Sequence, residues 1–139
     1  MGSSLSINEN CREACYRAVE IASSHGSMVT FDPNLRPELL DISTIRHICR
    51  PVLEVAKVVL PSGVEAEALT GASDPIEAGK KLLEYGPEIA VVKLGEKGSI
   101  AVMRGGVVEM LATRVEEVDP TGAGDVYDAA FVYGLLNNW

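Results

Sequence analysis

Residues 89–93 have the sequence IAVVK, and this short stretch decides the class of fold. Every residue except the closing lysine is apolar, without the polar alternation of a strand that has one face in water. Such a run is typical of a strand covered on both faces, as in parallel sheets flanked by helices. The stretch therefore predicts an α/β fold.

Strands alternate with helices on both sides of this stretch, which predicts a Rossmann-like, mostly parallel sheet with helices on both faces. Asp74 and Pro75 are typical of a helix start, and Gly86 of a helix end. Two apolar runs around a glycine turn predict an added antiparallel hairpin. The expected elements are a helix at 9–24, a strand at 28–32, a helix at 41–56 kinked or broken near Pro51, a strand at 57–61, helices at 63–71 and 73–86, the strand at 89–93, the hairpin at 99–113 and a last helix from Gly122.

The composition excludes several kinds of protein. With 139 residues and 47% hydrophobic content, the chain suits one compact domain or a large piece of one. The net charge is −8 and no basic run is present, which argues against nucleic acid as a partner. No apolar run reaches the roughly 20 residues that a membrane span needs. The three cysteines lack metal-ligand spacing, so free thiols in the cytoplasm are expected.

The stretch DPTGAGD at 119–125 places small residues where the last helix begins. The first N–H groups of a helix have no partner within the helix, and they lie at the positive end of its dipole. Small side chains let a phosphate approach these N–H groups closely. The stretch therefore predicts a phosphate site at the carboxyl ends of the strands, where ligands of such sheets bind.

Asp125 closes this stretch, and two explanations for it stay open. A carboxylate in the first helical turn gains about 0.3–1 kcal/mol from the helix dipole. Alternatively, Asp125 accepts the proton of an attacking hydroxyl group during phosphoryl transfer. Asp128 lies one turn further along the same helix face, and we expect it to be a solvated acid.

The stretch 119–125 resembles the C-terminal D-T-x-G-A-G-D motif of the ribokinase/PfkB family of carbohydrate kinases, with Pro120 at the second position. FDPNLR at 31–36 is similar to the D-x-N-x-R motif of its fructokinase and 2-keto-3-deoxygluconate kinase branches. The order of the motifs along the chain matches that family, which implies a ribokinase-like fold.

Two further segments carry the resemblance. LPSGVEAEALTG at 60–71 is similar to the family's N-x-x-E segment, with Ser62 in place of the asparagine. VVKLGEKGSIAV at 91–102 resembles its nucleotide-side strand–turn–strand. The resemblance covers residues 28–136, which is nearly the whole chain.

The resemblance implies phosphoryl transfer from ATP to a hydroxyl of a sugar or sugar acid. Asp125 is then the base, and it also contacts the substrate. The N–H groups of Gly122, Ala123 and Gly124 form the anion hole that stabilises the transferring phosphoryl group. Glu65 helps to hold Mg²⁺ through water.

The same resemblance assigns further binding residues. Asp119 belongs to a monovalent-cation site, where K⁺ would bind. Arg36 faces both nucleotide and substrate, and a guanidinium at this position suits an acidic sugar. The residues implied to bind the nucleotide are Asn34, Arg36, Ser62, Lys93, Gly95, Glu96, Gly98, Gly122 and Gly124.

Plainer explanations exist for several of these residues. Arg36 would then only pair with Glu38 or Asp32 at the surface, and Glu65 would lie on a solvated helix face. On the same plainer explanation, Lys93 would extend from its strand end to water. Gly95 and Gly98 would then only shape a hairpin turn.

Chains of the resembled family are much longer, and their N-terminal half carries the main sugar-binding residues. The 139 residues are therefore expected to be a single C-terminal, nucleotide-side portion without the family's last helices, inactive on its own. The parent protein is expected to be a cytoplasmic homo-oligomer. Alternatives are a nucleoside kinase of the same family and a nucleotide- or anion-binding module without catalysis. A dinucleotide-binding fragment of an oxidoreductase is disfavoured, because no G-x-G-x-x-G follows an early strand.

Overall fold

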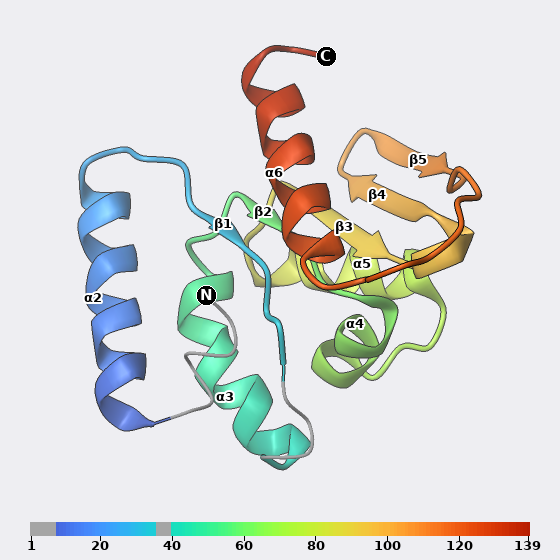
Figure 1. The fold of residues 1–139 in the computed structure, drawn as a ribbon. Helices are drawn as coiled ribbons and strands as arrows, with labels where there is room; N and C mark the ends of the chain where they lie inside the picture. Colours follow the sequence, from blue (N-terminus) through green and yellow to red (C-terminus); the bar gives the residue numbers. More distant parts are fainter. Residues whose placement is uncertain (1–7, 36–39) are drawn as a thin grey trace.

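The computed structural model describes residues 8–35 and 40–139. A single five-stranded sheet has the order β1-β2-β3-β4-β5 (Figure 1). The elements are α2 (Glu9–Ser24), β1 (Thr30–Phe31), α3 (Ile42–Leu53), β2 (Val58–Val59), α4 (Gly63–Thr70), α5 (Pro75–Tyr85), β3 (Ile89–Lys93), a 3₁₀ turn (Gly95–Lys97), β4 (Ser99–Met103), β5 (Gly106–Met110) and α6 (Ala123–Leu136).

The sheet has a parallel part and an antiparallel part. β1, β2 and β3 are parallel, with Phe31 beside Val59 and Val59 beside Ala90. β4 and β5 continue the sheet as the predicted antiparallel hairpin. The predicted α/β class with an added hairpin is confirmed.

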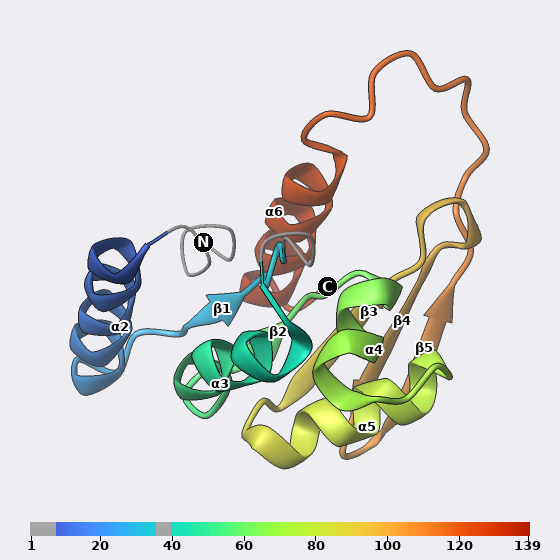
Figure 2. The same ribbon diagram turned by 90° about the horizontal axis from the view of Figure 1, so that it is seen from below.

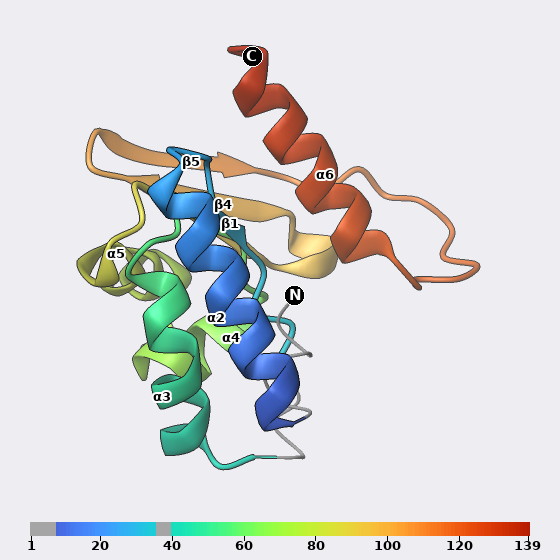
Figure 3. The same ribbon diagram turned by 90° about the vertical axis from the view of Figure 1, so that its left-hand side faces the viewer.

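Helices cover both faces of the sheet. Figure 3 shows α6 on one side and α3, α4 and α5 on the other. Val59, Ala90 and Val92 pack with buried residues of α3, α4 and α5. Val58 and Val91 face the other way, toward α6. The two faces follow from the alternation of side chains along each strand.

Helix starts follow from capping side chains. Asp41 accepts a hydrogen bond from the Thr44 N–H, and Asp74 accepts one from the Glu77 N–H, as expected of N-caps. Gly71 ends α4 in the left-handed conformation, with φ +74°. Local signals in the sequence therefore fix these boundaries.

Four elements are shorter than expected. Pro51 lies inside α3, and the helix continues past it to Leu53 rather than to residue 56. β1 and β2 are two residues long each, because parallel pairing extends over Thr30–Phe31 and Val58–Val59 only. β5 ends at Met110, and the segment after it has no regular structure before α6. Figure 2 shows this segment arching away from the sheet.

Within residues 8–35 and 40–139, no helix has the length and apolar character needed to cross a membrane. All three cysteines are free thiols, and Cys49 is buried.

Candidate functional site

The start of α6 leaves backbone donors open. Gly122 has φ +80°, a conformation that favours glycine, and caps the helix without a side-chain hydrogen bond. The Ala123 N–H donates to the Pro120 carbonyl at 3.1 Å. Among the described residues, no hydrogen bond uses the N–H groups of Gly122 or Gly124. The turn can therefore bind an anion through these two groups, while the Ala123 N–H already has a backbone partner.

Asp125 lies exposed in the first turn of α6. Within the described part of the chain, its carboxylate makes no hydrogen bond or ion pair. A carboxylate in this position is accessible to a ligand that approaches the start of the helix. This geometry is compatible with the predicted base.

Lys93 forms a cluster with two carboxylates from distant parts of the chain. Its Nζ lies 3.0 Å from Asp32 Oδ2, and 3.0 and 3.2 Å from the two carboxylate oxygens of Asp128. Asp32 follows β1, Lys93 ends β3, and Asp128 lies in the second turn of α6. The cluster therefore ties the start of α6 to the carboxyl ends of two parallel strands.

Burial and charge in this cluster oppose one another. Burial, and after it the hydrogen bond with the Asp32 carboxyl, raise the pKa of Asp128, and the Lys93 ammonium opposes the rise; the resulting pKa is about 7. Burial alone would lower the pKa of Lys93, but hydrogen bonds to both carboxylates outweigh it, so that pKa is raised. Lys93 therefore stays charged, whereas Asp128 changes its charge near neutral pH.

The expectation of a solvated Asp128 is wrong, because the side chain is only 16% exposed. Lys93 does not extend to water either; its side chain is 15% exposed. The spacing of three residues between Asp125 and Asp128 does place both on one helix face. Only the position of Lys93 at the end of β3, next to that face, shows which of the two acids is paired.

A groove of about 1250 Å³ joins several predicted residues. It lies between the turn after β3, the segment 112–120 and the start of α6. The predicted residues that line it are Lys93, Gly95, Glu96, Gly98, Asp119, Ala123 and Gly124. Asn34, Ser62, Glu65, Gly122 and Asp125 do not line it.

Gly98 and Gly124 both line this groove, and Gly98 is needed for its shape. A Cβ atom on Gly98 would lie 1.9 Å from the Met110 carbonyl oxygen, and its φ of +98° also favours glycine. A Cβ atom on Gly124 would lie 3.7 Å from Lys93 Nζ, in ordinary contact. The backbone therefore requires glycine at position 98, whereas position 124 has room for a Cβ atom beside the Lys93 ammonium.

Glu65 has a structural role in the described residues. One carboxylate oxygen accepts the Ser62 N–H at 2.7 Å and the Ser62 hydroxyl at 2.8 Å, and the other accepts the Leu35 N–H at 2.5 Å. Ser62 in turn caps α4, which completes a capping box. Glu65 is therefore not on a solvated helix face, and it joins the loop after β1 to α4.

The loop after β1 is only partly described. Asn34 is exposed with φ +40°, and its N–H donates to Asp32 Oδ1 at 3.0 Å. This turn orients the Asp32 carboxyl, whose other oxygen bonds to Lys93. Arg36 and Glu38 lie outside the described residues.

The predicted metal ligands do not converge. Asp119 accepts the Thr121 N–H at 2.9 Å, and this hydrogen bond lowers the pKa of Asp119. Among the described residues, no group of three or more histidine, cysteine or acidic side chains could hold a metal ion. Because Glu65 already accepts three hydrogen bonds, it fits Mg²⁺ through water better than as a direct ligand. Both metal roles stay predictions.

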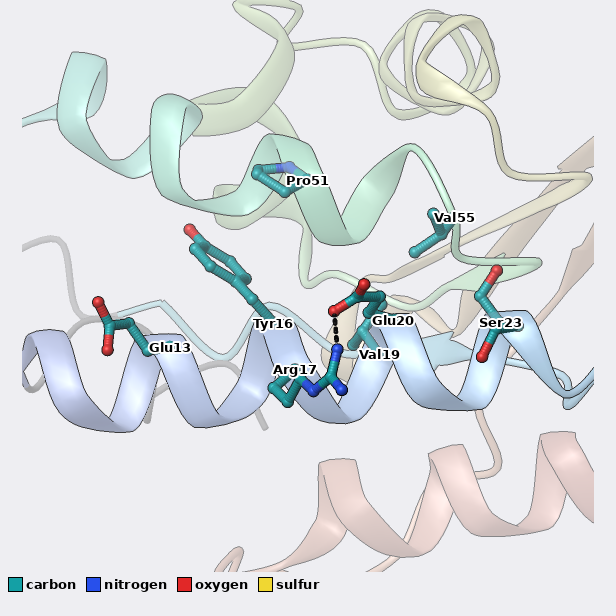
Figure 4. Close-up of a pocket in the computed structure, with 9 residues that line it drawn as sticks. Glu13, Tyr16, Arg17, Val19, Glu20, Ser23, Pro51 and Val55 are labelled. Carbon is teal, nitrogen blue, oxygen red and sulfur yellow. Dashed lines mark hydrogen bonds and ion pairs between the residues drawn. The ribbon is translucent and has the colours of Figure 1, made fainter.

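A second hollow, of about 690 Å³, lies between α2 and α3 (Figure 4). Tyr16 spans the two helices by donating its hydroxyl to the Ile48 carbonyl at 2.7 Å. Arg17 pairs with Glu20 along α2 at 2.6 Å, and both side chains are exposed. None of the predicted site residues lines this hollow.

The fold and the groove can be compared with known proteins. The family model described as pfkB family carbohydrate kinase matches residues 1–139, so the chain belongs to this family. The chain is 36% identical over 122 residues to a 2-dehydro-3-deoxygluconokinase of Thermoproteus tenax, covering 86% of this chain and 38% of that one. It is 35% identical over 130 residues to a fructokinase of Salmonella typhimurium, covering 92% of this chain and 41% of that one.

Solved structures agree with this assignment. A ribokinase II of E. coli, solved with ATP and Mg²⁺, superposes with a TM-score of 0.90 and 35% identity, covering 100% of this chain and 45% of that one. A fructokinase of Vibrio cholerae with bound fructose, ADP and potassium superposes with a TM-score of 0.84 and 28% identity, covering 96% of this chain and 43% of that one. The ribokinase-like fold is therefore confirmed. The chain spans less than half the length of these relatives.

Proposed function

We propose that the chain is the nucleotide-side portion of a kinase that transfers a phosphoryl group from ATP to a hydroxyl of a sugar or sugar acid. The observation that carries this proposal is the start of α6: Gly124, with its open N–H, and Lys93 line a groove, and the same helix start carries the open Gly122 N–H and the exposed Asp125. Phosphoryl transfer depends mainly on such placement of charge. The relatives with bound ATP or ADP support the choice of nucleotide.

In the proposed reaction, Asp125 takes the proton of the sugar hydroxyl. The hydroxyl oxygen then forms a bond to the γ-phosphorus, and the bond between that phosphorus and the leaving oxygen of ADP breaks. The open N–H groups of Gly122 and Gly124 stabilise the charge on the transferring group. Mg²⁺, when bound, would neutralise phosphate charge, with Glu65 holding one of its waters.

The substrate class follows from the relatives. Fructokinase and 2-dehydro-3-deoxygluconokinase relatives favour a fructose-like sugar or a keto-sugar acid. Unpaired cysteines are compatible with a cytoplasmic enzyme. A binding module without catalysis is the second candidate, because the chain spans only 38–45% of the relatives compared above.

Asp125→Asn tests the proposal. ADP formation is measured with ATP and a panel of sugars and sugar acids, on the chain and on the complete gene product that carries it. The variant should lower kcat by about 10²–10⁴-fold, because a positioned general base contributes this much. Its affinity for ATP, measured by titration calorimetry, should change little.

Asp74→Asn is the matched control, since it makes the same exchange at the start of α5, outside the groove, and asparagine caps a helix as well as aspartate does. Equal kcat in wild type and Asp125→Asn would exclude the general base. ATP binding without turnover in the complete gene product would favour the binding module.

A further inference from the structure

The Lys93 cluster is not used by the reaction steps above. A lysine ammonium has three N–H donors, and three carboxylate oxygens of Asp32 and Asp128 lie within 3.2 Å of it. The side chains of Lys93, Asp32 and Asp128 are 15%, 19% and 16% exposed, respectively. Hydrogen bonds between charged groups are strong where water is largely excluded. The ammonium is therefore held in one place.

That place lies beside the open N–H groups of α6. Lys93 lines the same groove as Ala123 and Gly124, and its Nζ would lie 3.7 Å from a Cβ atom on Gly124. Asp128 contacts Lys93 from the second turn of the same helix. The helix that offers the N–H groups thus also carries the side chain that fixes the ammonium.

We propose that Asp128 is a positioning residue for anion binding: it holds the Lys93 ammonium against the first turn of α6, so that this charge and the open N–H groups face the same phosphate. Asp32 holds the same ammonium from the end of β1. The proposal rests on the proposed function, because it names the residue that orients the cationic partner of the nucleotide.

A positioning role and a purely electrostatic role predict opposite effects. A carboxylate near a bound anion repels it, so its removal alone should strengthen binding. If Asp128 positions Lys93, its removal leaves the ammonium to Asp32 at the end of β1, away from α6, and binding weakens. The sign of the change in affinity therefore separates the two roles.

The test measures binding of ATP and of inorganic tripolyphosphate to the full chain by titration calorimetry. The titrations are run at pH 8.5, above the pKa of about 7 of Asp128. There Asp128→Asn and Asp32→Asn each remove one carboxylate from the same ammonium, so they change the local charge equally. Asp128→Asn should weaken both ligands about tenfold, which is the loss of one hydrogen bond to a charged group. The loss of affinity for both ligands caused by Asp32→Asn should be at least threefold smaller than that caused by Asp128→Asn. Glu77→Gln, in an exposed pair with Lys80 outside the groove, should leave both affinities unchanged.

Circular dichroism establishes that each variant is folded. If Asp128→Asn does not fold, Asp128→Glu and Asp32→Glu replace the pair, and the Asp128 variant must again weaken binding more. Unchanged or tighter binding by the Asp128 variant, or equal losses in the two variants, overturns the positioning role alone. A wild type that binds neither ligand overturns the proposed function as well.

Discussion

The two faces of the sheet are built from alternate residues of the same strands, yet they bury very different amounts of apolar surface. Val59 and Val92 on one face belong to a cluster of sixteen buried residues beneath α3, α4 and α5. Val58 and Val91 on the other face belong to a cluster of three, and no residue of α6 is itself buried.

The difference concerns what holds each layer in place. α6 packs on the sheet through the partly buried Tyr127, Phe131 and Leu135. Among the described residues, its polar links to the sheet are Tyr127 to Ser99 and Asp128 to Lys93. Elements that bind ligands usually belong to the less stable part of a protein. The first face should therefore govern stability, and the α6 face should govern binding.

Leu82→Ala should produce the largest change in stability. Leu82 is fully buried in α5, and truncation of such a residue costs about 2–5 kcal/mol. Urea unfolding measures the loss, and titration calorimetry should find the ATP affinity of the folded fraction unchanged. A large loss of affinity with little loss of stability would contradict the division between the faces.

Phe131→Ala should have a smaller effect on stability and a clear effect on binding. The ring is partly buried against the face that carries Val58 and Val91. We therefore expect the free energy of unfolding to fall by about 1–2 kcal/mol, less than the roughly 3–5 kcal/mol that truncation of a fully buried phenylalanine costs. Because the ring helps to hold α6, tripolyphosphate affinity should fall too. Phe131→Leu is the control, and retention of full affinity by Phe131→Ala would show that α6 is held by its polar contacts.

Gly79→Ala examines the close approach of α5 to β4. The added Cβ atom would lie 2.5 Å from Val102 Cγ2, and overpacking costs about 1–3 kcal/mol. The gain in helix propensity of about 1 kcal/mol offsets part of this cost. We expect a net loss of about 1 kcal/mol in urea unfolding and no change in ligand affinity. Stabilisation would show that Val102 moves aside easily.

A pH dependence of stability should also arise from Asp128. Its pKa of about 7 in the folded protein lies above the ordinary value of 3.8, so the folded state keeps a proton that the unfolded chain releases. This contribution to stability is fully present below about pH 4 and is lost as the pH rises to about 7.

Urea unfolding at several pH values measures this effect. The free energy of unfolding of wild type should fall relative to that of Asp128→Asn between pH 4 and 7, and the difference should be constant above that range. Lys93 and Asp32 face the same carboxyl and remain in both proteins. Parallel curves for the two proteins would show that Asp128 does not titrate in this range.

Local signals predicted much of the fold. The amphipathic pattern of residues 9–24 gave the observed range of that helix, and the continuous apolar run gave the strand at 89–93. The predicted lengths of β1 and β2 were too great, because the length of a strand is limited by its pairing with neighbouring strands and not by its composition. The pairing of Asp128 was not predictable, since it depends on a lysine 35 residues away in the sequence.

The sequence by itself determined the order of the elements, the glycine-rich start of α6 and the motifs that resemble a kinase family, because each depends on residues close together in the chain. Only the tertiary structure decided that Asp32, Lys93 and Asp128 form one cluster and that Glu65 joins the loop after β1 to α4. The physical reason is that the parallel order of β1, β2 and β3 brings strand ends together that are up to 61 residues apart.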